Sequence, residues 1–255
     1  MENHYNYLLI GMALLAAVVF VSLYFVNAGY GMMISKRWGP VLPNRWGWML
    51  MESPVFMLMI LLWACSDRMW EPTALCFFLF FELHYFQRSF VFPFLIRGDG
   101  RMPLSIMGMA FLFNLLNALM QGGWIFYVAP EGYYTSVNWF TTPQFIVGTL
   151  LFFVGMGINI HSDSIIRNLR KPGDTKHYLP RKGLFRYVSS ANYFGELIEW
   201  CGFALLTWSF AGAVFAWWTF ANLAPRAHAI HRRYSNEFGE EFKRLNPKRI
   251  IPFIY

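Results

Sequence analysis

Polar side chains recur at helical spacing between Gly155 and Trp200 of this 255-residue chain. One stripe consists of Asn159, Asp163, Arg167 and then Arg170 or Lys171, and a second consists of Asn192, Glu196 and Glu199. Because residues three and four apart share a helix face, each stripe forms a continuous polar strip. Guanidinium groups beside amides suit a pyrophosphate or a 2′-phosphate, which accepts forked, charged donors. A salt-bridged helix end is the simpler interpretation of the first stripe alone, but the second stripe favours a site for a charged ligand.

Ionisable groups also occur within apolar runs. Glu52 follows the start of one such run, where a charged carboxylate costs about 2.5 to 3.5 kcal/mol at the bilayer centre. It is either a helix-start carboxylate at the headgroup level or a functional group, and the sequence favours neither. His84, Tyr85 and Arg88 lie three and four residues apart, so a helix would let them face one cavity.

Other polar groups have plainer interpretations. Asn114, Asn117 and Gln121 form a further stripe, for which hydrogen bonding between helices is the favoured interpretation. His228 and His231 lie three apart, but the six histidines form no set of histidine boxes, so we expect no metal.

The GMG motif at Gly155 to Gly157 is not interpreted as a dinucleotide-binding turn. Ile160 replaces the third glycine of that fingerprint, and no strand precedes the motif. Small residues at this spacing are typical of closely packed membrane helices.

Composition identifies the class of protein that must position these groups. Hydrophobic residues make up 56% of the chain and charged residues 14%, with a mean hydropathy of +0.36, which indicates an integral membrane protein. The sequence predicts an all-α bundle of seven transmembrane helices, because a span needs about 20 apolar residues. The expected spans are Tyr7–Val26, Trp46–Cys65, Thr73–Phe92, Pro103–Tyr127, Thr142–His161, Tyr193–Ser209 and Gly212–Ala229.

Loop charge predicts the orientation of the bundle. An excess of Lys and Arg alternates between successive connections, which places the N-terminus outside and the C-terminus in the cytosol. The net charge of +7 then lies on the cytosolic face, where it can meet anionic headgroups or a phosphorylated cofactor. No separate basic domain exists, so nucleic acid is not expected as a partner.

Several motifs occur in a fixed order along nearly the whole chain. The most specific are VGMGINIHSD, RNLRKPGD, GLFRYVSSANYFGELIEW and the terminal IPFIY, and the weaker ones are YG at Tyr30, W-x-x-x-E-x-P at Trp48 to Pro54, HYFQRSF at His84 to Phe90 and N-x-x-x-Q-G at Asn117 to Gly122. With these motifs the chain resembles the steroid 5α-reductases, the 3-oxo-5α-steroid 4-dehydrogenases.

The resemblance implies a single transmembrane domain over residues 1–255 that uses NADPH to reduce the 4,5 double bond of a 3-oxo-Δ4-steroid. Glu52 and Tyr85 fall on the pair that engages the steroid 3-keto oxygen. The resemblance places most cofactor contacts in the half from about residue 143 to 255, at Asn159, Asp163, Arg170, Tyr178, Asn192, Glu196, Arg226 and Tyr234. It adds Arg88, Tyr30 and Trp48 from the first half. We expect a monomer among membrane lipids, in the cytoplasmic membrane of a bacterium or the endoplasmic reticulum of a eukaryote.

Three alternatives differ in chemistry. The nearest is a reductase of the same superfamily that acts on a polyprenol or an enoyl lipid. An isoprenylcysteine-type methyltransferase would bind S-adenosylmethionine instead, and its C-terminal segment resembles NEFGEEF at Asn236 to Phe242 in character. A non-enzymatic sterol carrier would need no paired polar stripes.

Overall fold

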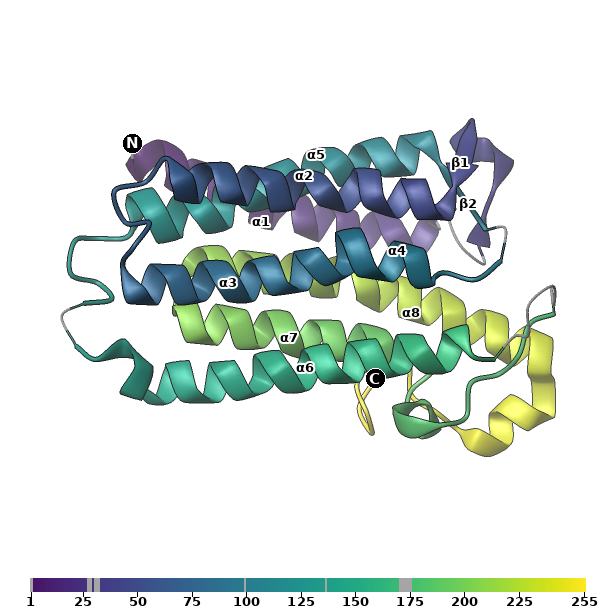
Figure 1. Cartoon of the computed structure of the whole chain (residues 1–255). Helices are drawn as coiled ribbons and strands as arrows, with labels where there is room; N and C mark the ends of the chain where they lie inside the picture. Colours follow the sequence, from purple (N-terminus) through teal and green to yellow (C-terminus); the bar gives the residue numbers. More distant parts are fainter. Residues whose placement is uncertain (1, 27–28, 30–32, 99, 136, 170–175) are drawn as a thin grey trace. The chain divides into compact units, whose positions relative to one another are not determined.

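The computed structural model describes residues 2–26, 29, 33–98, 100–135, 137–169 and 176–255. Most of these residues are helical (Figure 1). The α-helices are α1 Glu2–Phe25, α2 Asn44–Ala64, α3 Pro72–Phe86, α4 Phe92–Leu95, α5 Leu104–Gly123, α6 Pro143–Arg167, α7 Ala191–Thr207 and α8 Phe210–Leu245. Two π-helical turns, Gln87–Val91 and Trp124–Val128, extend α3 and α5, and 3₁₀-helices occupy Lys36–Trp38, Trp139–Thr141 and Gly183–Arg186.

One short ribbon departs from the expected all-α class. Strand β1, Val41–Pro43, pairs antiparallel with β2, Arg101–Pro103, and Leu42 lies opposite Met102. Proline flanks both helices that follow, since Pro43 precedes α2 and Pro103 precedes α5. The ribbon therefore fixes the starting points of two neighbouring helices.

Four helices are long and apolar enough to cross a membrane, among the residues described. They are α1, α2, α6, and α5 together with its π-helical turn. Each of the three remaining predicted spans also falls on a helix, but α3 and α7 are shorter, and α8 runs on to Leu245 across a kink at Gly239. The membrane-protein class is thus supported, while seven spans and the orientation of the termini stay predictions.

Contacts group the chain into two compact units, each of which has its own core. The first unit comprises residues 1–12, 28–146 and 207–211. In it, α2 packs most extensively against α5, and the hydroxyl of Tyr5 bonds to the carbonyl of Met120. Phe77, Phe81 and Met59 are completely buried. This unit holds Glu52 and Tyr85.

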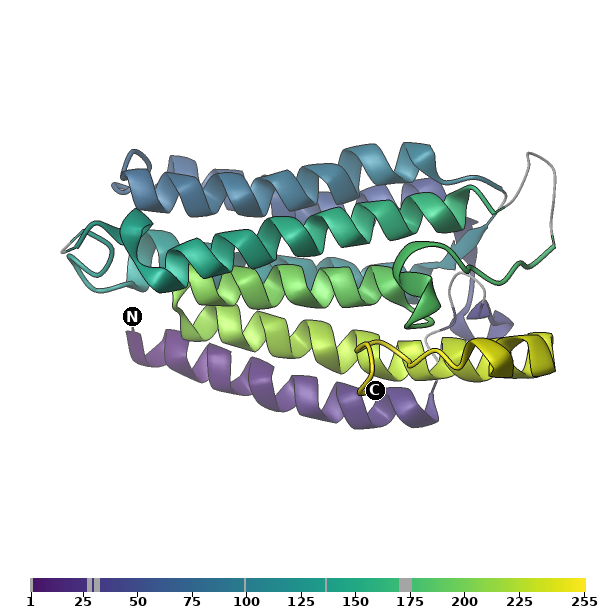
Figure 2. The same ribbon diagram turned by 90° about the horizontal axis from the view of Figure 1, so that it is seen from below.

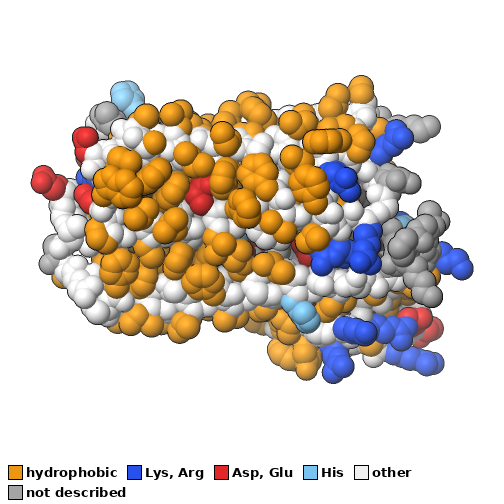
Figure 3. Space-filling model, in the orientation of Figure 1, with side chains coloured by type: hydrophobic (Ala, Val, Ile, Leu, Met, Phe, Trp, Pro, Cys, Tyr) orange, Lys and Arg blue, Asp and Glu red, His pale blue; other side chains and the backbone are white. Residues whose placement is uncertain are grey.

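The second unit comprises residues 13–27, 147–206 and 212–255. In both views α7 lies between α6 and α8 (Figures 1 and 2). Its core centres on Trp200, whose ring lies 4.4 Å from that of Phe215 and 5.7 Å from that of Phe203. In the view of Figure 3, hydrophobic side chains are spread along the middle of the visible surface, and Lys and Arg gather near the far end of α8. This unit holds both polar stripes.

Glycines set the distance between α6 and α7. A Cβ on Gly155 would lie 2.3 Å from the backbone nitrogen of Glu199, and one on Gly195 would lie 2.5 Å from that of Asn159. Such separations are impossible for real atoms, so the two backbones touch at this crossing. The packing role expected for the GMG motif is confirmed at Gly155 but not at Gly157, where a Cβ would meet open space.

Candidate active site and cofactor site

Glu52 is held by an amide from the facing helix. It lies on α2, partly buried, and Asn114 on α5 donates from Nδ2 to its Oε2 over 3.1 Å. The same amide donates to the backbone carbonyl of Met51. Asn114 therefore fixes one carboxyl oxygen of Glu52 relative to the backbone of its own helix.

Tyr85 is held in the same way one helix further along the chain. Its side chain on α3 is 3% exposed, and Asn117 of α5 donates from Nδ2 to the phenol oxygen over 2.9 Å. Gln121 lies one turn on and donates to the carbonyl of Ala211 over 3.0 Å, with a longer contact of 3.4 Å to Oδ1 of Asn117. Both candidate catalytic residues are thus hydrogen-bonded to amides of α5, Glu52 to Asn114 and Tyr85 to Asn117.

A π-helical turn follows Tyr85 directly. Residues Gln87–Val91 form it, and it contains Arg88, a buried cation. The guanidinium carbon of Arg88 lies 4.6 Å from the ring centroid of Trp48 and 4.5 Å from that of Phe92. A π turn inserts one extra residue into the helix, and such turns are frequent at functional sites. The guanidinium of Arg88 thus lies over two adjacent aromatic rings, which stabilise a cation in an apolar setting.

The second unit joins the two polar stripes by direct hydrogen bonds. Asn159 on α6 donates from Nδ2 to the backbone carbonyl of Asn192 over 3.0 Å and to Oε2 of Glu196 over 3.4 Å. Asn192 donates from its own Nδ2 to Oδ1 of Asp163 over 3.0 Å. The close glycine crossing brings the stripes into this range. Two carboxylates and two amides therefore form one connected polar cluster, called here the α6–α7 cluster.

Other candidate cofactor residues of this unit contact separate partners. Arg226 on α8 is buried and donates from Nε to the hydroxyl of Tyr193 over 2.7 Å. Tyr234 is buried against the rings of Phe238 and Phe242. Tyr178 is 42% exposed. Tyr30 and Arg170 lie outside the residues that the structure describes.

Two sets of hydrogen-bond partners were not predicted from the sequence. Asn114 and Asn117 were favoured as links between helices, and they are such links, but their partners are Glu52 and Tyr85. Tyr193 was not singled out, although it bonds Arg226. Spacing shows which groups share a helix face, whereas the identity of the partner on another helix depends on tertiary packing.

Comparisons with known proteins show which family this chain is similar to. The model of the family described as 3-oxo-5-alpha-steroid 4-dehydrogenase matches residues 100–255. The chain is 36% identical to "Steroid 5-alpha-reductase DET2" of Gossypium hirsutum, across 100% of this chain and 98% of that protein. It is 44% identical to "3-oxo-5-alpha-steroid 4-dehydrogenase 1" of Mus musculus, across 94% of this chain and 92% of that protein. It is 37% identical to "Steroid 5-alpha-reductase DET2" of Arabidopsis thaliana, across 100% of this chain and 98% of that protein.

Proposed function

The chain belongs to the 3-oxo-5-alpha-steroid 4-dehydrogenase family, and from this premise we propose that it reduces the 4,5 double bond of 3-oxo-Δ4-steroids with NADPH. It would act as an oxidoreductase on a CH–CH bond. The observation that carries the proposal is the pair of amide-anchored side chains, Glu52 with Asn114 and Tyr85 with Asn117, inside an apolar helical unit.

The chemistry of an enone explains why such a pair is needed. When an electron pair enters the β carbon of the conjugated ketone, negative charge develops on the ketone oxygen. Donors placed in advance at that oxygen stabilise the transition state more than the ground state. When bound, the nicotinamide of NADPH supplies the hydride, which we assign to C5 of the steroid.

Tyr85 is the assigned donor to the ketone oxygen. Because Asn117 donates to the phenol oxygen over 2.9 Å, that oxygen accepts while the phenol keeps its own proton to donate. Hydrogen bonds arranged in series polarise one another, so Asn117 makes Tyr85 a better donor. Burial of both residues keeps competing water away from the phenol.

Glu52 completes the pair in one of two ways. As a neutral acid it donates a second hydrogen bond to the ketone oxygen. A buried, protonated carboxylic acid has this role in another enzyme that acts on ketosteroids. As a carboxylate it orients Tyr85 instead. Asn114 donates to Oε2 in both cases, so the carboxyl group is positioned before substrate arrives.

The α6–α7 cluster has the chemistry that a dinucleotide requires. The carboxylates of Asp163 and Glu196 accept hydrogen bonds from Asn192 and Asn159, and they would accept them equally from the ribose hydroxyls of a bound dinucleotide. The amides of Asn159 and Asn192 offer both donors and acceptors. Arg226 adds a fixed guanidinium, which suits phosphate oxygens. Arg88, Trp48, Tyr178 and Tyr234 are assigned to NADPH on the resemblance alone, as are Tyr30 and Arg170.

Turnover by the purified chain tests this function. In detergent with NADPH and testosterone or progesterone, we expect NADPH oxidation and a 5α-dihydro product. Tyr85→Phe, which removes one donor, should lower the rate by about 100- to 1000-fold while NADPH still binds.

The same preparation separates the alternatives. Reduction of a polyprenal but of neither steroid would assign the chain to the neighbouring activity. Thermal stabilisation by S-adenosylmethionine instead of NADPH would support a methyltransferase. Full turnover by Tyr85→Phe would refute the assigned role of the phenol.

A further inference from the structure

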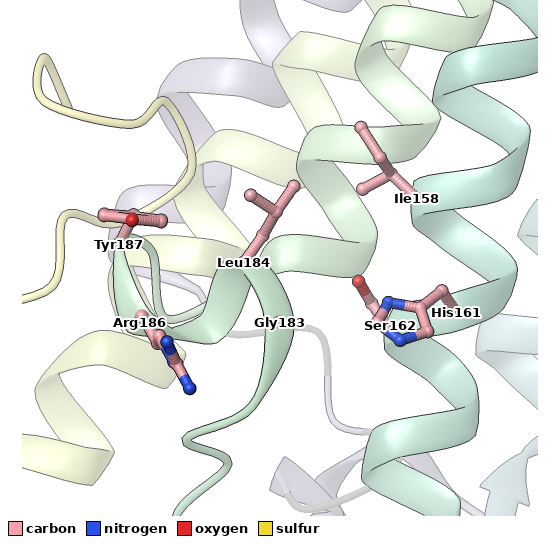
Figure 4. A pocket seen from close by; sticks show the side chains of 7 residues that line it. All are labelled: Ile158, His161, Ser162, Gly183, Leu184, Arg186 and Tyr187. Atoms are coloured by element: carbon pink, nitrogen blue, oxygen red, sulfur yellow. The ribbon is translucent and has the colours of Figure 1, made fainter.

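A pocket of about 430 Å³ opens on the second unit, between α6 and the 3₁₀-helix Gly183–Arg186 (Figure 4). Its lining residues are Ile158, His161, Ser162, Gly183, Leu184, Arg186 and Tyr187. None of them belongs to the catalytic or cofactor assignments above. His161 is two residues from both Asn159 and Asp163, so it lies about 200° around the helix from either. His161 therefore faces away from the α6–α7 cluster, whereas Ile158 and Ser162 line the pocket on the side of α6 nearer to that cluster.

The backbone of the 3₁₀-helix forms one wall of this pocket. Gly183 adopts a φ of +56°, and a Cβ there would lie 3.0 Å from Cε1 of His161 and 3.1 Å from Cδ1 of Ile165. A side chain at this position would meet both α6 residues in a backbone conformation that favours glycine. The imidazole and the loop backbone are thus held together. Figure 4 shows Ser162 and His161 on one side of the space and Leu184 and Arg186 on the other.

An exposed apolar stripe of α6 leads into the pocket. Leu150 is 61% exposed and Val154 54% exposed, and both lie on the helix face that continues through Gly157 to His161. A Cβ on Gly157 would meet nothing within 4 Å, so no neighbouring segment covers this face of the helix one turn before His161. This stripe lies along a helix that is long and apolar enough to span a membrane. It offers a track for a hydrocarbon chain.

Arg186 lines the pocket at the opposite end of the track, and two lysines are near it in the chain or in the fold. Lys182, Arg186 and Lys248 are all exposed, and the backbone nitrogen of Lys248 donates to the carbonyl of Tyr187 over 2.7 Å, which keeps Lys248 beside the pocket. Among the residues described here, Arg186 forms no ion pair. The rim therefore carries positive charge that suits a phosphate group.

Exposed aromatic and aliphatic side chains lie next to this rim. The Tyr187 ring is 5.4 Å from that of Phe253, which is 77% exposed, and Ile254 is 76% exposed. Such side chains are typical of the region where a bilayer meets water. Apolar track, cationic rim and interfacial side chains thus occur together on one surface of the second unit.

We propose that this pocket binds one anionic phospholipid of the surrounding bilayer. The headgroup phosphate binds Arg186, with Ser162 and His161 on the facing wall, and one acyl chain follows α6 past Gly157 toward Leu150. Only a lipid supplies both parts, since a free phosphate leaves the apolar track empty and a neutral lipid leaves the cations unmatched. The site is independent of the proposed reductase chemistry.

Native mass spectrometry of the purified chain, with phosphatidylglycerol and phosphatidylcholine of identical acyl chains, tests the proposal. The wild-type chain should retain one phosphatidylglycerol at concentrations where phosphatidylcholine is lost. Arg186→Glu should weaken retention by about tenfold or more, because it removes one favourable charge near the phosphate and adds an unfavourable one. Arg186→Lys should keep most of it, and an excess of inorganic phosphate should not displace the lipid.

Arg244→Glu is the matched control, since it makes the same change of charge at an exposed residue of α8 outside the pocket. If Arg186→Glu and Arg244→Glu lost phosphatidylglycerol equally, the proposal would be overturned, because the net charge of the chain alone would then explain the loss. A phosphatidylglycerol with a diazirine in its acyl chain should label α6 between Leu150 and His161 and lose that label in Arg186→Glu. Labelling confined to other helices would likewise overturn it.

Discussion

Asn117 donates a hydrogen bond of 2.9 Å to the phenol oxygen of Tyr85. Both side chains are buried, and they come from different helices of the first unit, α5 and α3. The bond fixes Tyr85, the assigned donor, to α5, a helix that contributes no assigned catalytic group. Asn117 thus acts through Tyr85, as a positioning residue.

Asn117→Leu should lower kcat by about tenfold, because Tyr85 loses the bond that orients it, and one buried hydrogen bond contributes about 0.5 to 1.5 kcal/mol. KM for NADPH should stay unchanged. When Asn117→Leu is added to Tyr85→Phe, it should lower kcat little further, since the hydroxyl that Asn117 bonds is already absent. Steady-state kinetics of the two single variants and the double variant measure the coupling. Additive losses would show that Asn117 acts on turnover through some other contact.

Glu52→Gln should keep part of the activity that Glu52→Ala loses. Glutamine retains a carbonyl oxygen that accepts from Asn114 and an amide that can donate to a ketone, whereas alanine removes both. We expect Glu52→Ala to lose about 100-fold in kcat. Equal loss in the two variants would indicate that Glu52 acts as a carboxylate that orients Tyr85.

Asn159→Ala should weaken NADPH binding by about tenfold, because it removes the amide that joins the two polar stripes. Turnover at saturating NADPH should change much less. Asn168→Ala, at an exposed asparagine just beyond the end of α6, is the matched control. Titration of NADPH by fluorescence compares them, and equal affinity in both variants would place the dinucleotide elsewhere.

Gly155→Ala should destabilise the chain by about 1 to 3 kcal/mol, since its Cβ would meet the backbone of Glu199. Gly157→Ala adds the same methyl group to the same helix, where nothing lies within 4 Å. It should be neutral or slightly stabilising, because alanine favours helix more than glycine does. Thermal unfolding in detergent measures both. Similar melting temperatures for the two variants would contradict the close crossing.

Acidification should destabilise the chain partly through His231, which lies on α8 beyond the predicted span. Burial lowers the pKa of its imidazole from 6.5, and the nearby Arg249 and His228 lower it further. The folded chain then keeps this ring neutral while the unfolded chain takes up a proton, so stability falls as the pH drops below about 6.5. His231→Gln should make stability less dependent on pH in this range. An unchanged slope would argue against the assignment.

Helix positions could be predicted from hydropathy, because apolar runs of spanning length are unambiguous. Each of the seven predicted spans falls on a helix. Helix ends were less predictable. The span expected over Thr73–Phe92, for example, is α-helical only to Phe86 and continues as the π-helical turn Gln87–Val91. The ribbon of β1 and β2 escaped notice because a three-residue strand has no measurable periodicity.

The polar stripes were visible in the sequence, but their connections were not. Spacing placed Asn159 with Asp163 and Asn192 with Glu196, whereas the bonds that join them cross between helices. The π-helical turn at Gln87–Val91 was also unpredictable, since the sequence there reads as ordinary helix. Partner choice depends on how helices pack, and a one-dimensional pattern does not encode that directly.

Main-chain atoms of α6 and α7 touch where Gly155 meets Gly195, and those atoms are common to every amino acid. The separation of the two helices at Asn159 and Asn192, which are joined by a hydrogen bond of 3.0 Å, is consequently set by the backbone. If the dinucleotide binds here as proposed, evolution could alter nucleotide preference by exchanging the polar groups of the two helices, but it could not move the helices closer by trimming a side chain. A change of cofactor preference would then require different polar residues on α6 and α7, while the distance between the two helices stays the same.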